Sequence, residues 1–210
     1  MQTQQTLKIL LVSWSILPYR SGTSFIVEKM AKNFKREELV VLGEKSLMDK
    51  PPKRAASFPK VVYYNSQFSI GGRGARFFTF FRQLLFKSLV KRIKKVVLLD
   101  RCNYVLSVFP DDYYAHAACL AAEELGVPFS SYFHNTYIEN EKVDQQKASV
   151  IQPKIFKNSE HIFVMSEGME QFYKKKYGLN KFKILVHTFD QYPDVPFTKL
   201  QPQEVNKTKL

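Results

Sequence analysis

Seven short apolar runs are spaced along the chain, each of a length that suits a β-strand. They occupy residues 8–12, 39–42, 61–64, 104–108, 129–133, 161–164 and 183–186. The first run has no polar alternation, which is typical of a strand buried on both faces. Segments with helical spacing of apolar residues separate most of the runs. This order predicts an α/β fold, a doubly wound parallel sheet of about seven strands with helices on both faces.

The predicted helix that opens near Asp111 shows how these segments begin and end. Gly126 and Pro128 end it, because Gly tolerates the left-handed conformation and Pro blocks continuation. Asp111 and Asp112 are candidates for a base or metal pair, but an N-cap is the favoured interpretation. Their adjacent spacing is not a DxD metal motif.

Ligands of a doubly wound sheet bind beyond the carboxyl ends of its strands. The loops expected at that edge are residues 13–23, 109–112, 134–139 and 165–168. We expect residues 1–190 of the 210 to form one domain. Residues 191–210 contain three prolines and are interpreted as an interdomain linker or the start of an absent C-terminal domain.

Positive charge is concentrated in one stretch. The formal net charge is +13, and residues 73–101 hold nine Lys and Arg against one acidic residue. A polyanionic partner is therefore expected at this stretch. In a helix over residues 73–97, most apolar residues fall on one side and most cations on the other. The aromatic and basic residues expected to contact a membrane or acceptor are Arg76, Phe77, Phe80, Phe81, Arg82, Lys87 and Lys91.

Three interpretations of this basic stretch remain open. In a lipid interface, aromatic side chains insert while Lys and Arg meet anionic headgroups, so an anionic membrane surface is the favoured partner. A solvated cationic face, with the aromatics packed under a neighbouring loop, is the second interpretation. Nucleic acid is the least favoured partner, because no recognition-helix or RNP-like signature accompanies the charge.

A turn of small residues, Ser21, Gly22 and Thr23, lies between the first strand and its helix. Backbone N–H groups at a helix N-terminus attract phosphate. The turn matches neither the GxGxxG fingerprint nor a P-loop, so it gives no support for a dinucleotide or ATP site. The alternative is that Gly22 only permits a tight turn.

Further polar residues follow later strands. His134 comes at the end of the fifth strand, where it could donate a hydrogen bond, stabilise developing charge or serve a structural role. Ser166 and Glu167 form either a helix cap or a ligand contact. The two cysteines lack a CxxC spacing, and the polar start does not resemble a signal peptide, so a reducing cytoplasm is expected.

Several of these segments together resemble the N-terminal half of GT-B-fold glycosyltransferases of family 4 (glycosyl transferases group 1). The first strand and the 21–23 turn are similar to that family's opening strand and Gly-Gly loop, with Ser21 in place of the first Gly. Residues 125–128 resemble its lGvP helix end, and residues 133–135 resemble its vHg strand end. Residues 161–167 resemble its strand and Ser-Glu segment. Residues 183–190 resemble its hinge, but with His-Thr where Pro-Asn is usual.

The resemblance implies a Rossmann-like, acceptor-binding domain of a retaining enzyme that uses a sugar nucleotide and needs no metal or other cofactor. It implies that Gly22, with its neighbours Ser21 and Thr23, approaches the donor phosphates. By the same resemblance His134 is catalytic, near the transferred sugar, and Ser166 and Glu167 line the cleft. The expected acceptor is a lipid-linked or envelope glycan at the inner face of the cell membrane. A non-catalytic Rossmann-like binding module is the main alternative function, and a nucleic-acid-binding domain is a weaker one.

Overall fold

The computed structural model places most of the predicted elements. It describes residues 6–18, 21–45, 50, 52–64, 85–109, 111–140 and 143–186. The strands are β1 (Ile9–Ser13), β2 (Leu39–Glu44), β3 (Lys60–Tyr64), β4 (Tyr104–Phe109), β5 (Phe129–Phe133), β6 (Ile162–Val164) and β7 (Phe182–Ile184). The helices are α1 (Gly22–Lys32), α3 (Phe86–Leu99), α4 (Asp112–Leu125), α5 (Gln145–Asn158) and α6 (Glu167–Tyr177).

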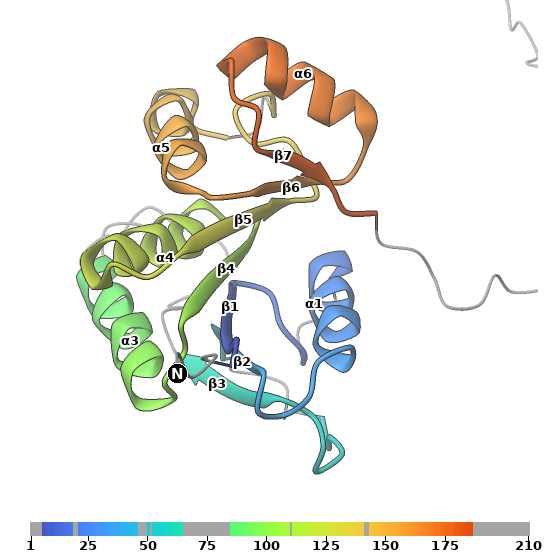
Figure 1. Ribbon diagram of the computed structural model, residues 1–210, viewed down its shortest axis with the longest axis vertical. Helices are drawn as coiled ribbons and strands as arrows, with labels where there is room; N and C mark the ends of the chain where they lie inside the picture. The colour runs from blue at the N-terminus through green and yellow to red at the C-terminus, as the bar shows by residue number, and fades with distance from the viewer. Residues whose placement is uncertain are drawn as a thin grey trace, which may run out of the picture.

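All seven strands form one parallel sheet in the order β3-β2-β1-β4-β5-β6-β7 (Figure 1). The chain therefore starts in the middle of the sheet, builds outward to β3, and then crosses back beyond β1. This doubly wound topology confirms the predicted fold class. The carboxyl ends of β1 and β4, where the winding direction reverses, mark the expected ligand edge.

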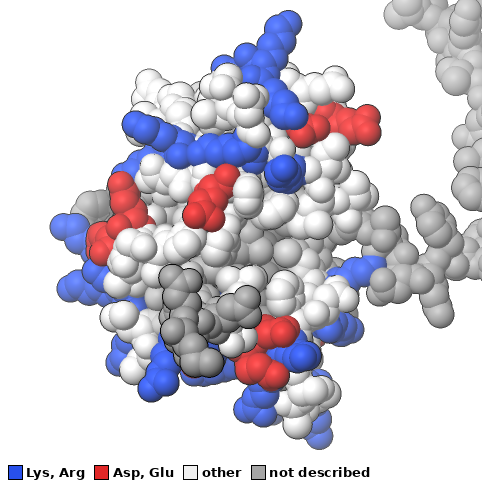
Figure 2. All heavy atoms as spheres, in the orientation of Figure 1, with Lys and Arg blue, Asp and Glu red and all other residues white. Residues whose placement is uncertain are grey.

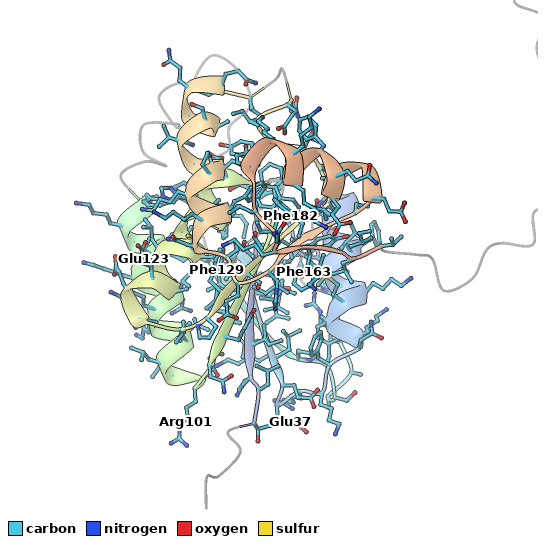
Figure 3. All side chains as sticks on the ribbon, turned by 45° about the horizontal axis from the view of Figure 1, so that its top comes forward. Glu37, Arg101, Glu123, Phe129, Phe163 and Phe182 are labelled. Carbon is cyan, nitrogen blue, oxygen red and sulfur yellow. The ribbon has the colours of Figure 1, made fainter. Side chains whose placement is uncertain are left out.

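Helices cover the two faces of the sheet unequally. The larger core cluster joins one face of the sheet to α3, α4, α5 and α6. The smaller cluster joins the other face to α1 (Figure 1). In Figure 3, Phe129 and Phe182 belong to the larger cluster, and Phe163 packs against the smaller one. Beside α1, an apolar hollow of about 780 Å³ extends over the strands as far as Val186.

The helix ends follow the local chemistry of the sequence. The Asp111 carboxylate accepts a hydrogen bond from the Tyr114 N–H at 2.9 Å, which confirms the predicted N-cap of α4. Gly126 ends α4 in the left-handed conformation, with φ of 64°. Buried Leu89, Ile93 and other residues of α3 lie on the predicted apolar side. These matches show that the boundaries are largely encoded locally.

The second strand is longer than predicted. The sequence predicts a strand over residues 39–42, but β2 continues through Gly43 to Glu44. A Cβ atom at Gly43 would lie 2.6 Å from the Ser13 carbonyl oxygen and 2.7 Å from the Ile16 side chain. The glycine therefore allows the loop after β1 to pass close over β2, and it does not break the strand.

Candidate functional site

The loop after β1 and the segment after β5 meet at the carboxyl edge of the sheet. Thr23 Oγ1 and His134 Nε2 form a hydrogen bond of 3.2 Å. Each of these residues is only 5% exposed. Thr23 lies in the first turn of α1, and His134 directly follows β5. Two residues that the sequence analysis selected from distant loops are therefore in contact, and the Thr23 hydroxyl orients the imidazole.

Gly22 is exposed beside this pair. It is the first residue of α1, and a Cβ atom at this position would meet nothing within 4 Å. Its φ lies outside the region that favours glycine. Neither steric contacts nor the backbone conformation therefore require a glycine at position 22. A glycine at an open helix N-terminus is suited to close approach of a ligand to the backbone.

Ser21 has a structural role in the same turn. Its Oγ accepts a hydrogen bond from the Ser24 N–H at 3.1 Å, and the Ser24 Oγ accepts one from the Ser21 N–H at 3.1 Å. This is a reciprocal N-terminal cap. The Ser21 Oγ also lies 2.5 Å from the Ser15 Oγ. Its side chain is therefore used to fix the turn, which leaves backbone N–H groups as the natural phosphate contacts.

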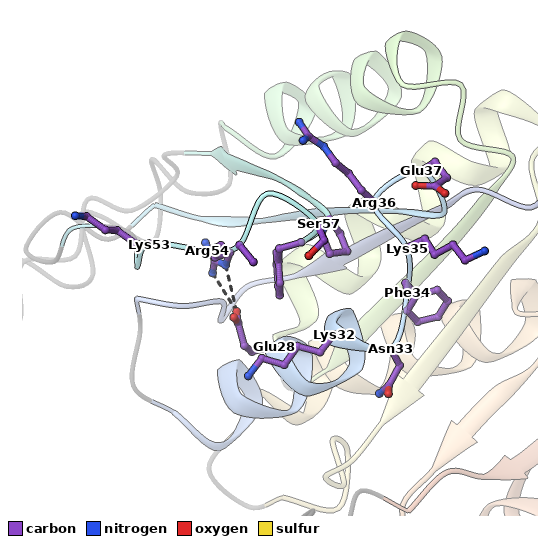
Figure 4. A pocket seen from close by; sticks show the side chains of 13 residues that line it. Glu28, Lys32, Asn33, Phe34, Lys35, Arg36, Glu37, Lys53, Arg54 and Ser57 are labelled. Carbon is purple, nitrogen blue, oxygen red and sulfur yellow. Dashed lines mark hydrogen bonds and ion pairs between the residues drawn. The ribbon is translucent and has the colours of Figure 1, made fainter.

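A set of contacts not foreseen from the sequence fixes the loop after β1 from its outer side. The Tyr63 hydroxyl donates to the Leu17 carbonyl oxygen at 2.9 Å, and Arg54 Nη1 donates to the Tyr63 hydroxyl at 2.9 Å. Arg54 also forms an ion pair with Glu28 of α1 at 3.1 Å (Figure 4). The hollow of about 690 Å³ drawn in Figure 4 lies along the second half of α1, away from Gly22. Arg54 therefore connects α1 and β3 beside the loop after β1.

A buried acid at the end of β2 was also missed. The Tyr114 hydroxyl donates to Glu44 Oε2 at 2.5 Å, and both residues are fully buried. The Glu44 N–H donates to the Trp14 carbonyl oxygen at 3.1 Å. Glu44 therefore joins the end of β2 to α4 and to the loop after β1.

The loop after β5 is packed beneath the candidate edge. Tyr137 is 4% exposed, and its ring centroid lies 4.9 Å from that of Phe109. Burial, followed by the negative charge of Asp112 and a hydrogen bond to it, raises the pKa of Tyr137 well above its usual value. Its hydroxyl therefore stays protonated, and it anchors the loop that carries His134.

Ser166 and Glu167 both begin α6 at the same edge of the sheet. The Ser166 Oγ accepts a hydrogen bond from the Met169 N–H at 3.3 Å, which confirms the cap. Ser166 and Glu167 are both exposed. The structure therefore places Ser166 and Glu167 on the rim of this edge, and a ligand role for them stays a prediction.

Two kinds of catalytic chemistry lack support in the described part of the chain. Burial raises the pKa of both Cys102 and Cys119 to about 11, so neither thiol is an activated nucleophile. Among the residues that the structure describes, no group of three His, Cys, Asp or Glu side chains is placed to hold a metal ion.

The cationic surface is only partly described. Lys87 and Lys91 are exposed on α3, which contains no acidic residue. On the face drawn in Figure 2, basic side chains border the side on which α3 lies. The residues Arg76, Phe77, Phe80, Phe81 and Arg82 lie outside the described residues. Within the described part, no helix is long and apolar enough to cross a bilayer.

Comparison with known proteins supports the fold. No protein-family model matches the sequence, and no curated protein matches it. Anabaena Alr3699/HepE in complex with UDP matches with a TM-score of 0.56 and 15% identity, over 88% of this chain and 45% of that chain. The UDP-GlcNAc 2-epimerase from Methanocaldococcus jannaschii matches with a TM-score of 0.52 and 14% identity, over 86% of this chain and 45% of that chain. Glycyrrhiza uralensis UGT73P12 complexed with glycyrrhetinic acid 3-O-monoglucuronide matches with a TM-score of 0.55 and 15% identity, over 87% of this chain and 48% of that chain.

The chain therefore has the Rossmann-like fold of one half of a GT-B-like protein. It spans a little less than half the length of the solved structures that it matches. At these identities the similarity establishes the fold, and the predicted α/β architecture is confirmed. A shared fold does not define a function, which depends on the residues of the site.

Proposed function

We propose that this chain is the acceptor-binding N-terminal domain of a retaining glycosyltransferase of GT-B family 4. It would move a sugar from a sugar nucleotide to a lipid-linked or envelope glycan acceptor in polysaccharide biosynthesis. The contact between Thr23 and His134 beside Gly22 carries the proposal, because it fixes two loops at the expected ligand edge. Further support comes from proteins of the same fold whose structures hold UDP, Anabaena Alr3699/HepE and S. aureus MnaA.

In this proposal the donor diphosphate lies against the N-terminus of α1. The exposed backbone at Gly22 allows a phosphate to approach without meeting a side chain. His134 contacts the transferred sugar, and Thr23 acts as a positioning residue that holds the imidazole ring. Ser166 and Glu167 line the rim. Helix N-terminal N–H groups would stabilise the charge that develops on the leaving diphosphate.

Transfer with retention passes through an oxocarbenium-like transition state. Because the leaving group is a diphosphate, transfer needs several hydrogen-bond donors around the diphosphate oxygens. It also needs water to be excluded from around the anomeric carbon. We expect no metal ion and no cofactor beyond the sugar nucleotide itself. The domain's own contribution is to orient the acceptor and one side of the donor.

The proposed function also requires a C-terminal Rossmann-like domain as a partner of this chain. The chain covers a little less than half of the matched structures. In the family 4 enzymes that the sequence resembles, the C-terminal half supplies most nucleotide contacts, and we propose the same division here. We therefore expect the purified chain to be inactive by itself. The test is to read the coding sequence beyond Leu210 for a Rossmann-like half with a Glu-x7-Glu motif, in frame or in an adjacent gene. Its absence would favour a non-catalytic binding module, and robust transfer by this chain without a partner would contradict the two-domain assignment.

The proposed location is the cytoplasmic face of the cell membrane, with the domain bound peripherally. The support is the exposed Lys87 and Lys91 on a helix without acidic residues, followed by exposed Leu98 and Leu99 at its end. Anionic headgroups would meet the lysines at the surface. Stronger binding to DNA than to anionic vesicles would favour the nucleic-acid alternative instead.

A further inference from the structure

A small hollow of about 250 Å³ lies where α3, α4 and α5 begin. Its lining residues are Phe86, Asp112, Tyr113, His116, Lys147 and Ile151. In a parallel sheet the helices start at the carboxyl edge, so this hollow opens on the edge that also carries Thr23 and His134. The hydrogen bond between Asp112 and Tyr137 connects its rim to the loop after β5.

The surface that lines the hollow is mostly apolar. The Phe86 ring centroid lies 5.4 Å from that of Tyr113 and 5.1 Å from that of His116. Ile151 closes the other side and is 6% exposed. Burial, followed by repulsion from Lys154, lowers the pKa of His116, so its ring is neutral near pH 7. Charge enters only at the rim, where Lys147 forms an ion pair with Asp112.

The mostly apolar lining of the hollow favours binding of an alkyl chain over binding of a sugar ring. Sugar hydroxyl groups that entered the hollow would lose water without finding enough hydrogen-bond partners. Each methylene that leaves water for such a site strengthens binding about fourfold. The volume is below that of a typical whole-ligand pocket, so it suits one part of an amphipathic molecule.

We propose that this hollow holds the alkyl chain of an amphipathic acceptor, with the polar head at the carboxyl edge of the sheet. This assignment rests on the proposed function, and it narrows the acceptor to one with an alkyl portion directly beside the reacting group. The ion pair at the rim marks where the apolar portion of the acceptor ends. Exposed Lys87, next to Phe86, continues the surface toward the cationic side of α3.

The experiment titrates the full chain with ethyl, butyl and hexyl β-D-glucoside, each below its micelle concentration. Binding is followed by the NMR signals of the Ile151 methyl groups and the His116 ring. We expect affinity to rise about fourfold per added methylene up to the capacity of the hollow. Equal affinity for the ethyl and hexyl compounds would overturn the proposal.

Two α5 variants then locate the binding. Ile151→Trp fills the hollow and should weaken hexyl glucoside binding at least tenfold. Val150→Trp is the matched control, because Val150 is 70% exposed on the same helix and is not among the lining residues. Unchanged binding by a folded Ile151→Trp protein would contradict the assignment. If that variant does not fold, nuclear Overhauser contacts from the hexyl chain to Phe86 and Ile151 in the wild type decide, and their absence overturns the proposal.

The same samples are titrated with UDP to separate this inference from the proposed function. Chain-length-dependent binding without any UDP response would leave the alkyl site standing and count against the donor site. A UDP response at Gly22 and Thr23 without chain-length-dependent glucoside binding would support the donor site and overturn the alkyl site. The two failures are therefore distinguishable.

Discussion

Thr23 and His134 are 111 residues apart in the sequence, and their side chains meet in a buried hydrogen bond of 3.2 Å. The contact joins the first helix to the segment after the fifth strand. It exists because β1 and β5 both lie next to β4, so the loops after them share one edge of the sheet. A buried imidazole needs such a partner, since unsatisfied polar groups are costly in an interior.

Thr23→Val should therefore destabilise the protein although the side chain keeps its shape. Loss of the hydroxyl removes a hydrogen-bond partner from buried His134, and we expect the free energy of unfolding to fall by about 1–3 kcal/mol. Urea unfolding measures the change. Thr23→Ser, which keeps the hydroxyl, should recover most of it. Equal stability of the Val and Ser variants would show that the contact contributes nothing.

Gly43→Ala and Gly22→Ala should have opposite outcomes. An Ala Cβ at position 43 would lie 2.6 Å from the Ser13 carbonyl oxygen, so overpacking should cost about 1–3 kcal/mol. At position 22 the same atom meets nothing within 4 Å, and helix propensity favours Ala over Gly. Thermal melts of both variants check this. Similar melting temperatures for the two would refute the close approach of the loop after β1 to β2.

Stability should fall as the pH drops below about 6.5, in part because of His116. Burial, followed by repulsion from Lys154, lowers the pKa of His116 in the folded state below its usual value of 6.5. The unfolded state therefore takes up a proton first, and this contribution to stability is lost as pH falls from 6.5 toward the folded-state pKa. Lys147 adds to the shift, while Asp112 and Glu123 oppose it.

Urea midpoints between pH 7.5 and 5 measure this dependence. His116→Gln should flatten the curve relative to wild type. The control is Gln146→Ala, at an exposed position without a titratable side chain, which should leave the slope unchanged. A wild-type slope in the His116 variant would mean that other groups cause the acid sensitivity.

Neutralising α3 should weaken binding to anionic vesicles. Each surface lysine contributes about 1 kcal/mol to such binding, so Lys87→Gln with Lys91→Gln should lower vesicle partitioning roughly thirtyfold. Co-sedimentation with phosphatidylglycerol vesicles measures this. The control pair is Lys175→Gln with Lys183→Gln, at exposed lysines outside α3. Equal losses from both pairs would point to net charge as the cause, and no loss from either would remove the support for membrane contact through α3.

The sequence predicts the strands well because they are short runs rich in apolar residues, and the central strands β1, β2 and β4 are almost entirely buried. The caps at Asp111 and Ser166 are also predictable, since they depend on residues three positions apart. Glu44 was missed because an acid after a glycine looks like a loop residue. Its burial depends on the Tyr114 hydroxyl, 70 residues away along the chain.

In the candidate site too, the sequence predicts residues by their local position but not the contacts that distant segments make. Position at strand ends selected Gly22, Thr23 and His134, and the structure brings Thr23 and His134 into contact. Arg54 supports the loop after β1 from the polar segment that precedes β3, and Tyr63 supports it from β3 itself. A signal for them exists only in three dimensions, because an Arg in a loop is usually solvated.

An NMR titration of the chain with UDP-glucose tests the central claim most directly. We expect the largest shifts at the amides of Gly22 and Thr23 and at the His134 ring. Gly22→Val should weaken the response at least tenfold, because its branched side chain would occupy the space that the phosphates approach. Ala55→Val, at an exposed loop position, should leave it unchanged. Shifts confined to other parts of the protein, or equal binding by wild type and Gly22→Val, would contradict a donor site at this edge of the sheet.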